Sequence, residues 1–391
     1  MSHEVPLSAP YLDDEDRRVV ADVLGGRILS IGPWVDRFEA ALAAASDRRH
    51  AVAMSSGTAA LHLIVRALGW KAGDEVITTP FSFVASANCL FYEQVRPVFV
   101  DIDPVTRCID PARVEAAITP RTVGILSVDV FGHPADWPAL EAIAARHGLT
   151  LVTDSCESLG SSRDEGGRRV PAGKSGAAGA FAFYPNKQIT TGEGGAVVTD
   201  DERIARLCRS MRNQGRDEGA GWLQHARLGW NYRLSEINAA LGVSQARRLP
   251  EIRARRAEVV SRYVEFLAPL AGRVTPPEAV GAVDVCWFVY VVQLADAFTA
   301  ADRDAILAAL RAAGIGCSNY FSPIHLQPYV REALGCGAGD FPETERIAAR
   351  TIALPFHTAL DADAQRRVVD ELARQVDRHR PRGALTSADH A

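Results

Sequence analysis

A lysine, Lys187, lies in a glycine-bearing connection between two apolar runs of the chain. The runs, Phe181 to Tyr184 and Gly194 to Thr199, are predicted to be strands because they are short and rich in aromatic or β-branched residues. Loops that are held by strands often carry reactive side chains. A lysine in a loop is more commonly a solvated surface group, so Lys187 indicates catalysis only if other reactive groups lie beside it.

A predicted strand–turn–helix junction could bind phosphate. The apolar run Ala51 to Met54 is followed by Ser55, Ser56, Gly57 and Thr58, after which an apolar helical pattern begins. Serine or threonine at a helix start caps free amides, and glycine lets the backbone approach a ligand closely. The N-terminus of a helix also presents N–H groups and a positive dipole end to an anion. An ordinary helix cap has the same residue types, so this turn alone is ambiguous.

An aspartate, Asp154, ends the third informative stretch, Leu149 to Ser155. The stretch reads LTLVTDS and is predicted to be a buried strand. A carboxylate at the carboxyl end of a strand in an open α/β sheet points into the crevice where ligands bind. A turn residue or helix cap is the alternative reading of Asp154.

The order phosphate-binding turn, strand-end aspartate and loop lysine is the arrangement that pyridoxal phosphate requires. The turn would hold the phosphate, and Asp154 would keep the pyridine nitrogen protonated so that the ring can take up electrons. Lys187 would form a Schiff base with the aldehyde. The three stretches together therefore predict a pyridoxal phosphate site with Asp154 and Lys187 as its catalytic residues.

The elements that must position these residues alternate between strands and helices. Such alternation indicates βαβ units and a mostly parallel, doubly wound sheet, that is, an α/β fold. A nicotinamide-binding fold would alternate in the same way, but no GxGxxG follows the first strand. The predicted strands are 75–78, 97–100 and 123–128, and the predicted helices are 85–92, 114–118 and 140–147.

With 391 residues the chain can form a large domain and a smaller one. A long helical pattern over 237–270, broken near Pro250, is predicted to bridge them. The predicted division is a large cofactor-binding domain over 1–249, a small C-terminal α+β domain over 250–380 and a disordered polar tail over 381–391. The small domain is predicted to contain a strand–helix–strand unit over 285–294, 302–313 and 315–319.

Composition argues against several classes of protein. The formal net charge is −5 and basic residues are scattered among acidic ones, so no nucleic-acid-binding groove is expected. No apolar run is long enough to cross a membrane, and the first residues lack the pattern of a signal peptide. The seven cysteines are dispersed without CxxC spacing, which argues against a metal site or a disulfide framework. We therefore expect a cytoplasmic protein without a bound metal.

From about Leu7 to His357 the sequence resembles the DegT/DnrJ/EryC1/StrS family of sugar aminotransferases, within fold type I of the pyridoxal phosphate enzymes. Besides the turn at Ser56 and the strand-end Asp154, the matching motifs are FYPNKQITTGEGG around Lys187 and GWNYRLSEINAA around Asn231. The resemblance implies a ping-pong transfer of an amino group from L-glutamate, or glutamine, to a keto-sugar that is usually nucleotide-linked. It also implies a homodimer with shared active sites.

The resemblance also implies roles for individual residues. Phe83 would stack on the cofactor ring, and Asn231 would reach the cofactor phosphate of the neighbouring subunit. Without the resemblance, Phe83 would be read as a core residue, His325 as structural, and Arg233 as a partner of Glu236 at i,i+3 spacing. The implied cofactor contacts are Ser56, Gly57, Thr58, Phe83, Asp154, Glu157, Lys187 and Asn231. The implied substrate contacts are Ser30, Gly32, Tyr184, Glu193, Arg233 and His325.

The sequence departs from the family pattern at two positions. Ala182 stands where the family commonly has a serine that donates to the phosphate, five residues before the lysine. Glu157 stands where the family often has glutamine, three residues after the aspartate. An ionised Glu157 would repel the phenolate oxygen of the cofactor, so we expect it to be protonated, paired or turned away.

Four other functions share parts of this pattern. A sugar 3-dehydratase of the same family has histidine in place of the lysine, so Lys187 argues against it. A cysteine desulfurase needs a reactive cysteine on a mobile loop, and none of the seven cysteines is placed in that way. An aminocyclitol aminotransferase acting on a keto-inositol, and a regulator that binds pyridoxal phosphate without turnover, remain as alternatives.

Overall fold

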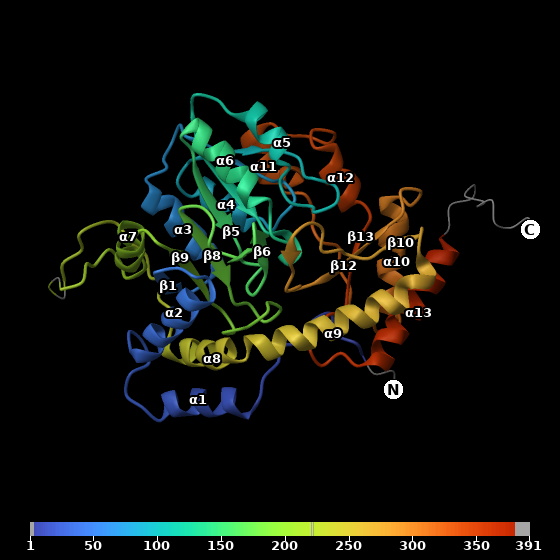
Figure 1. Cartoon of the computed structure of the whole chain (residues 1–391), viewed down its shortest axis with the longest axis horizontal. Helices are drawn as coiled ribbons and strands as arrows, with labels where there is room; N and C mark the ends of the chain where they lie inside the picture. The colour runs from blue at the N-terminus through green and yellow to red at the C-terminus, as the bar shows by residue number, and fades with distance from the viewer. Residues whose placement is uncertain (1–3, 220, 222, 380–391) are drawn as a thin grey trace, which may run out of the picture.

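The computed structural model describes residues 4–219, 221 and 223–379 (Figure 1). A seven-stranded sheet has the order β1-β9-β8-β5-β4-β2-β3, and within it only β9 runs antiparallel to its neighbours. The expected mostly parallel α/β sheet is thus confirmed. Its strands are β1 (His50–Met54), β2 (Glu75–Thr78), β3 (Arg96–Phe99), β4 (Thr122–Val128), β5 (Thr150–Asp154), β8 (Ala178–Ala182) and β9 (Gly195–Thr199).

Helices cover the sheet, and its strands are therefore buried along almost their whole length. Helix α3 contacts β8 and β9, α6 contacts β4 and β5, and α2 contacts β1 and β9. The helices of this part are α1 (Asp14–Leu24), α2 (Pro33–Ala45), α3 (Gly57–Leu68), α4 (Ala85–Phe91), α5 (Pro111–Val114), α6 (Trp137–His147), α7 (Glu202–Arg212) and α8 (Glu236–Arg247). Short 3₁₀ helices cover Glu115–Ala117 and Val130–Gly132.

The strand that leads to Lys187 begins and ends earlier than its aromatic residues suggest. It covers Ala178–Ala182, whereas the predicted strand covered 181–184. The run of alanine and glycine at its start has low intrinsic strand preference, but β5 pairs with it and buries it. Tyr184 instead begins the turn that carries the lysine, since its carbonyl accepts a hydrogen bond from the N–H of Lys187 at 2.9 Å.

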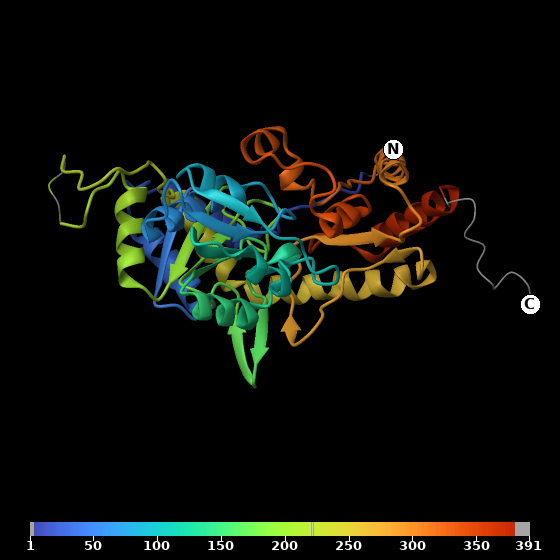
Figure 2. The same ribbon diagram turned by 90° about the horizontal axis from the view of Figure 1, so that it is seen from above.

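A hairpin that the sequence pattern does not predict follows β5. It consists of β6 (Ser162–Glu165) and β7 (Arg168–Pro171), and β11 (Val283–Asp284) pairs with β6. Gly166 and Gly167 both have positive φ, which is the geometry of a two-residue hairpin turn. The hairpin projects from the body of the molecule (Figure 2).

The C-terminal part contains a separate antiparallel sheet with the order β10-β12-β13. Its strands are β10 (Val274–Thr275), β12 (Tyr290–Leu294) and β13 (Thr351–Leu354). Its helices are α9 (Leu249–Leu267), α10 (Ala300–Ala312), α11 (Pro328–Leu334), α12 (Pro342–Ala348) and α13 (Ala362–Arg378), with 3₁₀ helices at Ala268–Leu270 and Ile324–Leu326. The smaller α+β part expected at the C-terminus is therefore present.

The predicted strand–helix–strand unit of this part is wrong in its last element. Residues 315–319 form only isolated bridges, from Ile315 to Val5 and from Ser318 to Ala353. The main chain around Ile315 is engaged by the N-terminal segment, since the N–H of Val5 donates to Gly314 and the N–H of Gly316 donates to Val5. Strand β12 instead pairs with β10 on one side and with β13, which lies much later in the chain, on the other.

Helix α9 connects the two sheets. The helical pattern breaks between α8 and α9, with Pro250 in the first turn of α9, where its missing N–H has no cost. The break expected near Pro250 is thus confirmed, and α9 runs from beneath the large sheet to the C-terminal part (Figure 1). The domain boundary at 249/250 stays a prediction, and the tail expected to be disordered, 381–391, lies outside the described residues.

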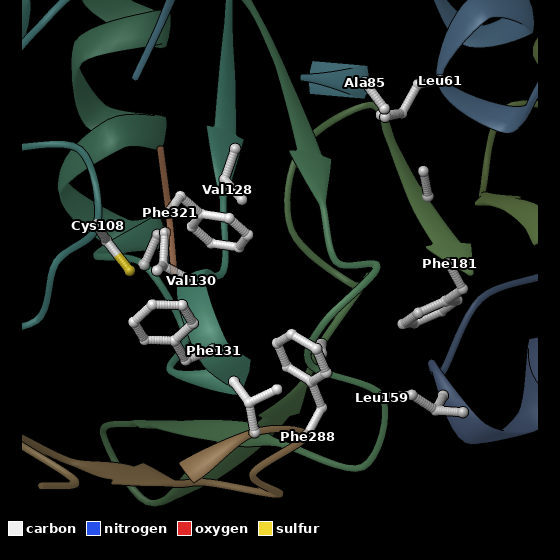
Figure 3. Packing of buried hydrophobic residues seen from close by; sticks show 14 of the residues in the cluster. Leu61, Ala85, Cys108, Val128, Val130, Phe131, Leu159, Phe181, Phe288 and Phe321 are labelled. Carbon is white, nitrogen blue, oxygen red and sulfur yellow. The ribbon is translucent and has the colours of Figure 1, made fainter. Parts of the chain in front are cut away.

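A hydrophobic core continues from the large sheet into the C-terminal part. Phe131 follows β4 and stacks on Phe321 with ring centroids 5.3 Å apart, and Phe288 lies nearby (Figure 3). These aromatic rings fill the space beside the carboxyl ends of the central strands. Over the described ranges, the model contains no helix with the length and apolar character that crossing a membrane requires.

Candidate active site

A cavity of about 660 Å³ opens beside the carboxyl end of β5. Nine of the predicted cofactor and substrate contacts line it: Ser56, Gly57, Thr58, Phe83, Asp154, Glu157, Tyr184, Lys187 and Glu193. The other lining residues include Ser82, Cys156, Ala182, Asn186, Phe288, Ser318, Asn319, Tyr320 and Phe321. The fold thus brings the turn, the aspartate and the lysine into one space, as their positions at strand ends predict.

The N-terminus of α3 forms one wall of this cavity. Ser56 is the N-cap, and its hydroxyl accepts a hydrogen bond from the N–H of Ala59 at 3.1 Å. A Cβ atom on Gly57 would lie 2.7 Å from the Cβ of Ala182 and 3.0 Å from the Sγ of Cys156, so no side chain fits there. The glycine keeps the first amides of α3 accessible, and such a helix start suits a phosphate group.

Asp154 is held in the cavity by neutral donors. It is 5% exposed, its Oδ2 accepts from the hydroxyl of Ser86 at 2.7 Å, and its Oδ1 accepts from the N–H of Cys156 at 3.2 Å. Within the described part of the chain, no lysine, arginine or histidine forms an ion pair with it. A buried carboxylate of this kind favours a cationic partner, and a protonated ring nitrogen is such a partner.

Lys187 extends from its loop between an acid and an aromatic ring. Its Nζ lies 3.6 Å from Oε1 of Glu157 and 4.1 Å from the ring centroid of Phe288. The face of an aromatic ring attracts a cation, so Phe288 and Glu157 together form a place for the end of this side chain. The amine therefore has a defined place in the cavity before any ligand binds.

Glu157 is buried and faces the lysine. Its Oε2 accepts from the N–H of Phe131 at 2.8 Å, which orients Oε1 toward Lys187. Burial raises the pKa of Glu157 to about 7, and the nearby lysine opposes that rise. Of the three states expected for this glutamate, the structure shows the paired one.

Several predicted site residues lie outside this cavity. Gly32 and Arg233 line a different cavity of about 560 Å³, where Nη1 of Arg233 donates to Oδ1 of Asn213 at 2.9 Å. Asn231 is exposed and forms a bridge with the same Asn213, and Ser30 forms a bridge with Ser235.

His325, predicted to contact substrate, lies apart from this cavity, and its substrate contact stays a prediction. The ring is fully buried, its Nε2 lies 3.0 Å from Oε1 of Glu345, and it packs edge-on against Phe341 with centroids 4.7 Å apart. It does not line the cavity that contains Lys187. The contacts of the His325 ring with Glu345 and Phe341 are those of a side chain that stabilises the C-terminal part.

The alternative pairing of Arg233 with Glu236 is also wrong. The carboxylate of Glu236 instead accepts from the main-chain N–H groups of Gly32, Trp34 and Val35 at 2.9–3.1 Å. These amides are at the start of α2 and have no partner within the helix. Glu236 thus caps α2 from a distant part of the chain and is not available to Arg233.

Comparison with known proteins decides the family. The model of the DegT/DnrJ/EryC1/StrS aminotransferase family matches residues 10–373. The chain belongs to this family. It is 35% identical to the spore coat polysaccharide biosynthesis protein SpsC of Bacillus subtilis, over 93% of this chain and 94% of that protein. It is 36% identical to GDP-perosamine synthase of Caulobacter vibrioides, over 93% of this chain and 96% of that protein.

A solved structure is also similar to this chain. DesI in the presence of its TDP-sugar product superimposes with a TM-score of 0.87 at 34% identity, covering 97% of this chain and 95% of DesI. The fold type I architecture and the transaminase class expected from the sequence are thereby confirmed.

Some residues in or beside the cavity of this aminotransferase were not found from the sequence. Ser86, which donates to Asp154, lies one helical turn after Phe83, and this spacing could have indicated it. Phe288 and Tyr320 come from the C-terminal part, and no local pattern connects them with Lys187. Asn186, the residue before the lysine, lines the cavity with a buried Oδ1 that has no hydrogen-bond partner in the structure.

The raised pKa of Glu157 predicts a pH-dependent effect of Glu157→Gln on stability. In the unfolded chain a glutamate has a pKa near 4.3, so the folded chain binds the proton more tightly. The resulting stabilisation is fully present below the unfolded pKa and is lost as pH rises through about 7. We expect the Tm of cofactor-free Glu157→Gln, relative to that of the wild-type protein, to rise between pH 4.5 and pH ~8. If the difference in Tm between Glu157→Gln and the wild-type protein is the same at every pH in this range, the pKa of Glu157 is not raised by burial.

Proposed function

We propose that this aminotransferase uses pyridoxal phosphate to move an amino group from L-glutamate to a nucleotide-linked keto-sugar, by a ping-pong reaction. The observation that carries the proposal is the convergence of the α3 N-terminus, Asp154 and Lys187 on one cavity. When bound, pyridoxal phosphate supplies an electron sink for the pair of electrons left at the amino carbon. The lining residues fit this group, because they offer an anion site, a carboxylate and an amine.

Each of these groups has a proposed task. The amides of α3 and the hydroxyl of Thr58 would bind the phosphate without the serine that Ala182 replaces. Asp154 would hold a proton on the ring nitrogen, and Phe83, which is 61% exposed, would cover one face of the ring. The amine of Lys187 would act as the base that moves the proton from the amino carbon.

The sugar acceptor is proposed from the relatives. One relative is named for a GDP-linked product, and the solved DesI structure contains a TDP-sugar. The cavity supports a polar acceptor, since Ser318, Asn319 and Tyr320 are among its lining residues. Hydroxyl and amide side chains of this kind can hydrogen-bond sugar hydroxyls.

A homodimer with shared sites is part of the proposal. Asn231 and Arg233 lie outside the cavity of their own chain, so they would act only if a second copy brings its cavity to them. The apolar side chains of Ile28, Leu29 and Ile31 are exposed in the segment before α2, as expected of a surface that another copy covers. A fully active protein that sediments as a monomer would contradict this arrangement.

The test of function offers the loaded protein three acceptors with L-glutamate as donor. We expect amination of a nucleotide-linked keto-sugar, and no amination of the same sugar without its nucleotide. Turnover of a keto-inositol alone would assign the protein to the aminocyclitol branch. A failure to convert glutamate to 2-oxoglutarate with any acceptor, in protein that contains the cofactor, would instead favour the regulatory alternative.

A further inference from the structure

Arg256, on helix α9, donates hydrogen bonds to the main chain of the lysine loop. Its guanidinium donates to the carbonyl oxygen of Lys187 at 3.0 Å and to the carbonyl oxygens of Trp287 and Phe288, each at 3.2 Å. The residue is 5% exposed. One buried side chain thus contacts both the reactive lysine and the residue whose ring lies beneath the lysine amine.

The charge of Arg256 has no acidic partner among the residues that the structure describes. A buried cation without an ion pair is costly, and burial lowers the pKa of Arg256 to about 10. The guanidinium also lies over the ring of Phe356, with the guanidinium carbon 5.3 Å from the ring centroid. Hydrogen bonds from a charged donor are stronger than neutral ones, so the three carbonyl groups are held firmly.

Gln188, the residue after Lys187, makes a further hydrogen bond to the same segment. Its buried amide nitrogen donates to the carbonyl oxygens of Glu157 and Cys286. The carbonyls of residues 286–288 therefore accept bonds from the two side chains that adjoin the lysine backbone. This segment leads directly into β12, so the lysine loop is fixed to the entrance of the C-terminal sheet.

We propose that Arg256 is a positioning residue for the aminotransfer reaction. It fixes the carbonyl of Lys187 relative to Phe288, and so holds the lysine amine at one place in the cavity. The inference rests on the proposed function, in which Lys187 carries the cofactor and moves the proton. A displaced amine would slow proton transfer more than it would weaken substrate binding, because proton transfer depends on alignment of the reacting atoms.

Arg256→Met removes the contacts, and Arg262→Met is the matched control. Arg262 lies on the same helix and also donates to a carbonyl, that of Leu360 at 2.8 Å, but its hydrogen bonds go to Leu360 and Gln365 and not to the lysine loop. Arg256→Lys keeps a charge but cannot reach all three carbonyl groups at once, and it serves as a second variant if Arg256→Met fails to fold.

The first readout is hydrogen exchange of the cofactor-free protein. We expect the amides of residues 184–190 to exchange about tenfold faster or more in Arg256→Met, and faster to a smaller extent in Arg256→Lys, because a charge-assisted hydrogen bond has been lost. Exchange in β4 and β5 should remain at the wild-type rate. Unchanged exchange over 184–190 in a folded Arg256 variant, or an equal increase in every segment and in Arg262→Met, would overturn the proposal.

The second readout is whether the substitution changes kcat or KM in the enzyme that contains the cofactor. We expect kcat of Arg256→Met to fall about tenfold or more with little change in the KM for glutamate, and Arg256→Lys to recover part of the loss. A rise in KM alone would contradict a positioning role. If Lys187 is not the cofactor lysine, the Lys187→Ala protein will keep its activity, and the proposed role of Lys187 fails. The exchange experiment does not use the cofactor, so it tests the Arg256 contacts separately.

Discussion

Lys187→Ala is expected to abolish multiple turnovers and the yellow colour of the loaded protein. The substitution removes the amine that would bond to the cofactor and the base that would move the substrate proton. Loss of a general base alone typically costs about 10²–10⁴-fold in rate. The measurements are kcat with glutamate and a keto-sugar acceptor, and the visible absorption spectrum. A Lys187→Ala protein that retains both would show that the assignment of this lysine is wrong.

The small number of lysines makes a matched control straightforward. The chain has only three, Lys71, Lys174 and Lys187. Lys71 is exposed, and Lys174 pairs with Asp47 and Asp200 at the surface. The double variant Lys71→Arg/Lys174→Arg keeps those charges and should retain the wild-type spectrum and kcat, so an effect of Lys187→Ala cannot come from lost surface charge.

The second large effect is expected for Asp154→Asn. The amide keeps the shape of the side chain but removes the negative charge that would favour a protonated ring nitrogen, and each unit of pKa corresponds to ~1.4 kcal/mol. The loss acts on the transition state for proton transfer, so it should lower kcat by about 10²-fold or more, with little change in cofactor affinity. Steady-state kinetics with cofactor titration measures both quantities.

Ser86→Ala provides a comparison for Asp154→Asn. It removes the hydroxyl that donates to Oδ2 of Asp154 at 2.7 Å but leaves the carboxylate charge in place. We expect a smaller loss of kcat, about tenfold or less, as for one hydrogen bond to a charged group. Near-wild-type kcat for Asp154→Asn would mean that Asp154 only stabilises its turn through the N–H of Cys156, a task that asparagine performs equally well.

The parts of the candidate site that could be predicted lie at strand ends. The Ser56 turn, Asp154 and Lys187 each follow or precede a short apolar strand, and these strands pair closely in one sheet. The local pattern therefore predicts that they lie in the same crevice. The glutamate at 157 could be recognised as unusual, but its pairing with Lys187 depends on the N–H of Phe131, which belongs to a different strand end.

The parts that could not be predicted depend on contacts between distant segments. Phe288 and Arg256 reach Lys187 only because α9 and the segment before β12 pack against the lysine loop. Glu236 caps α2 across the molecule, so the i,i+3 spacing that suggested a pair with Arg233 was misleading. The strand expected over 315–319 is replaced by two isolated bridges to distant segments, from Ile315 to Val5 and from Ser318 to Ala353, which no local pattern indicates.

Mapping the residue that carries the cofactor tests the central claim most directly. Borohydride reduces the bond between the cofactor's aldehyde carbon and a lysine nitrogen to a stable amine, so the labelled peptide can be identified by mass spectrometry. The account predicts that the label is found on the peptide that contains Lys187 and is absent from those with Lys71 and Lys174. A label on either of those two lysines, or no labelled lysine in yellow protein, would contradict it.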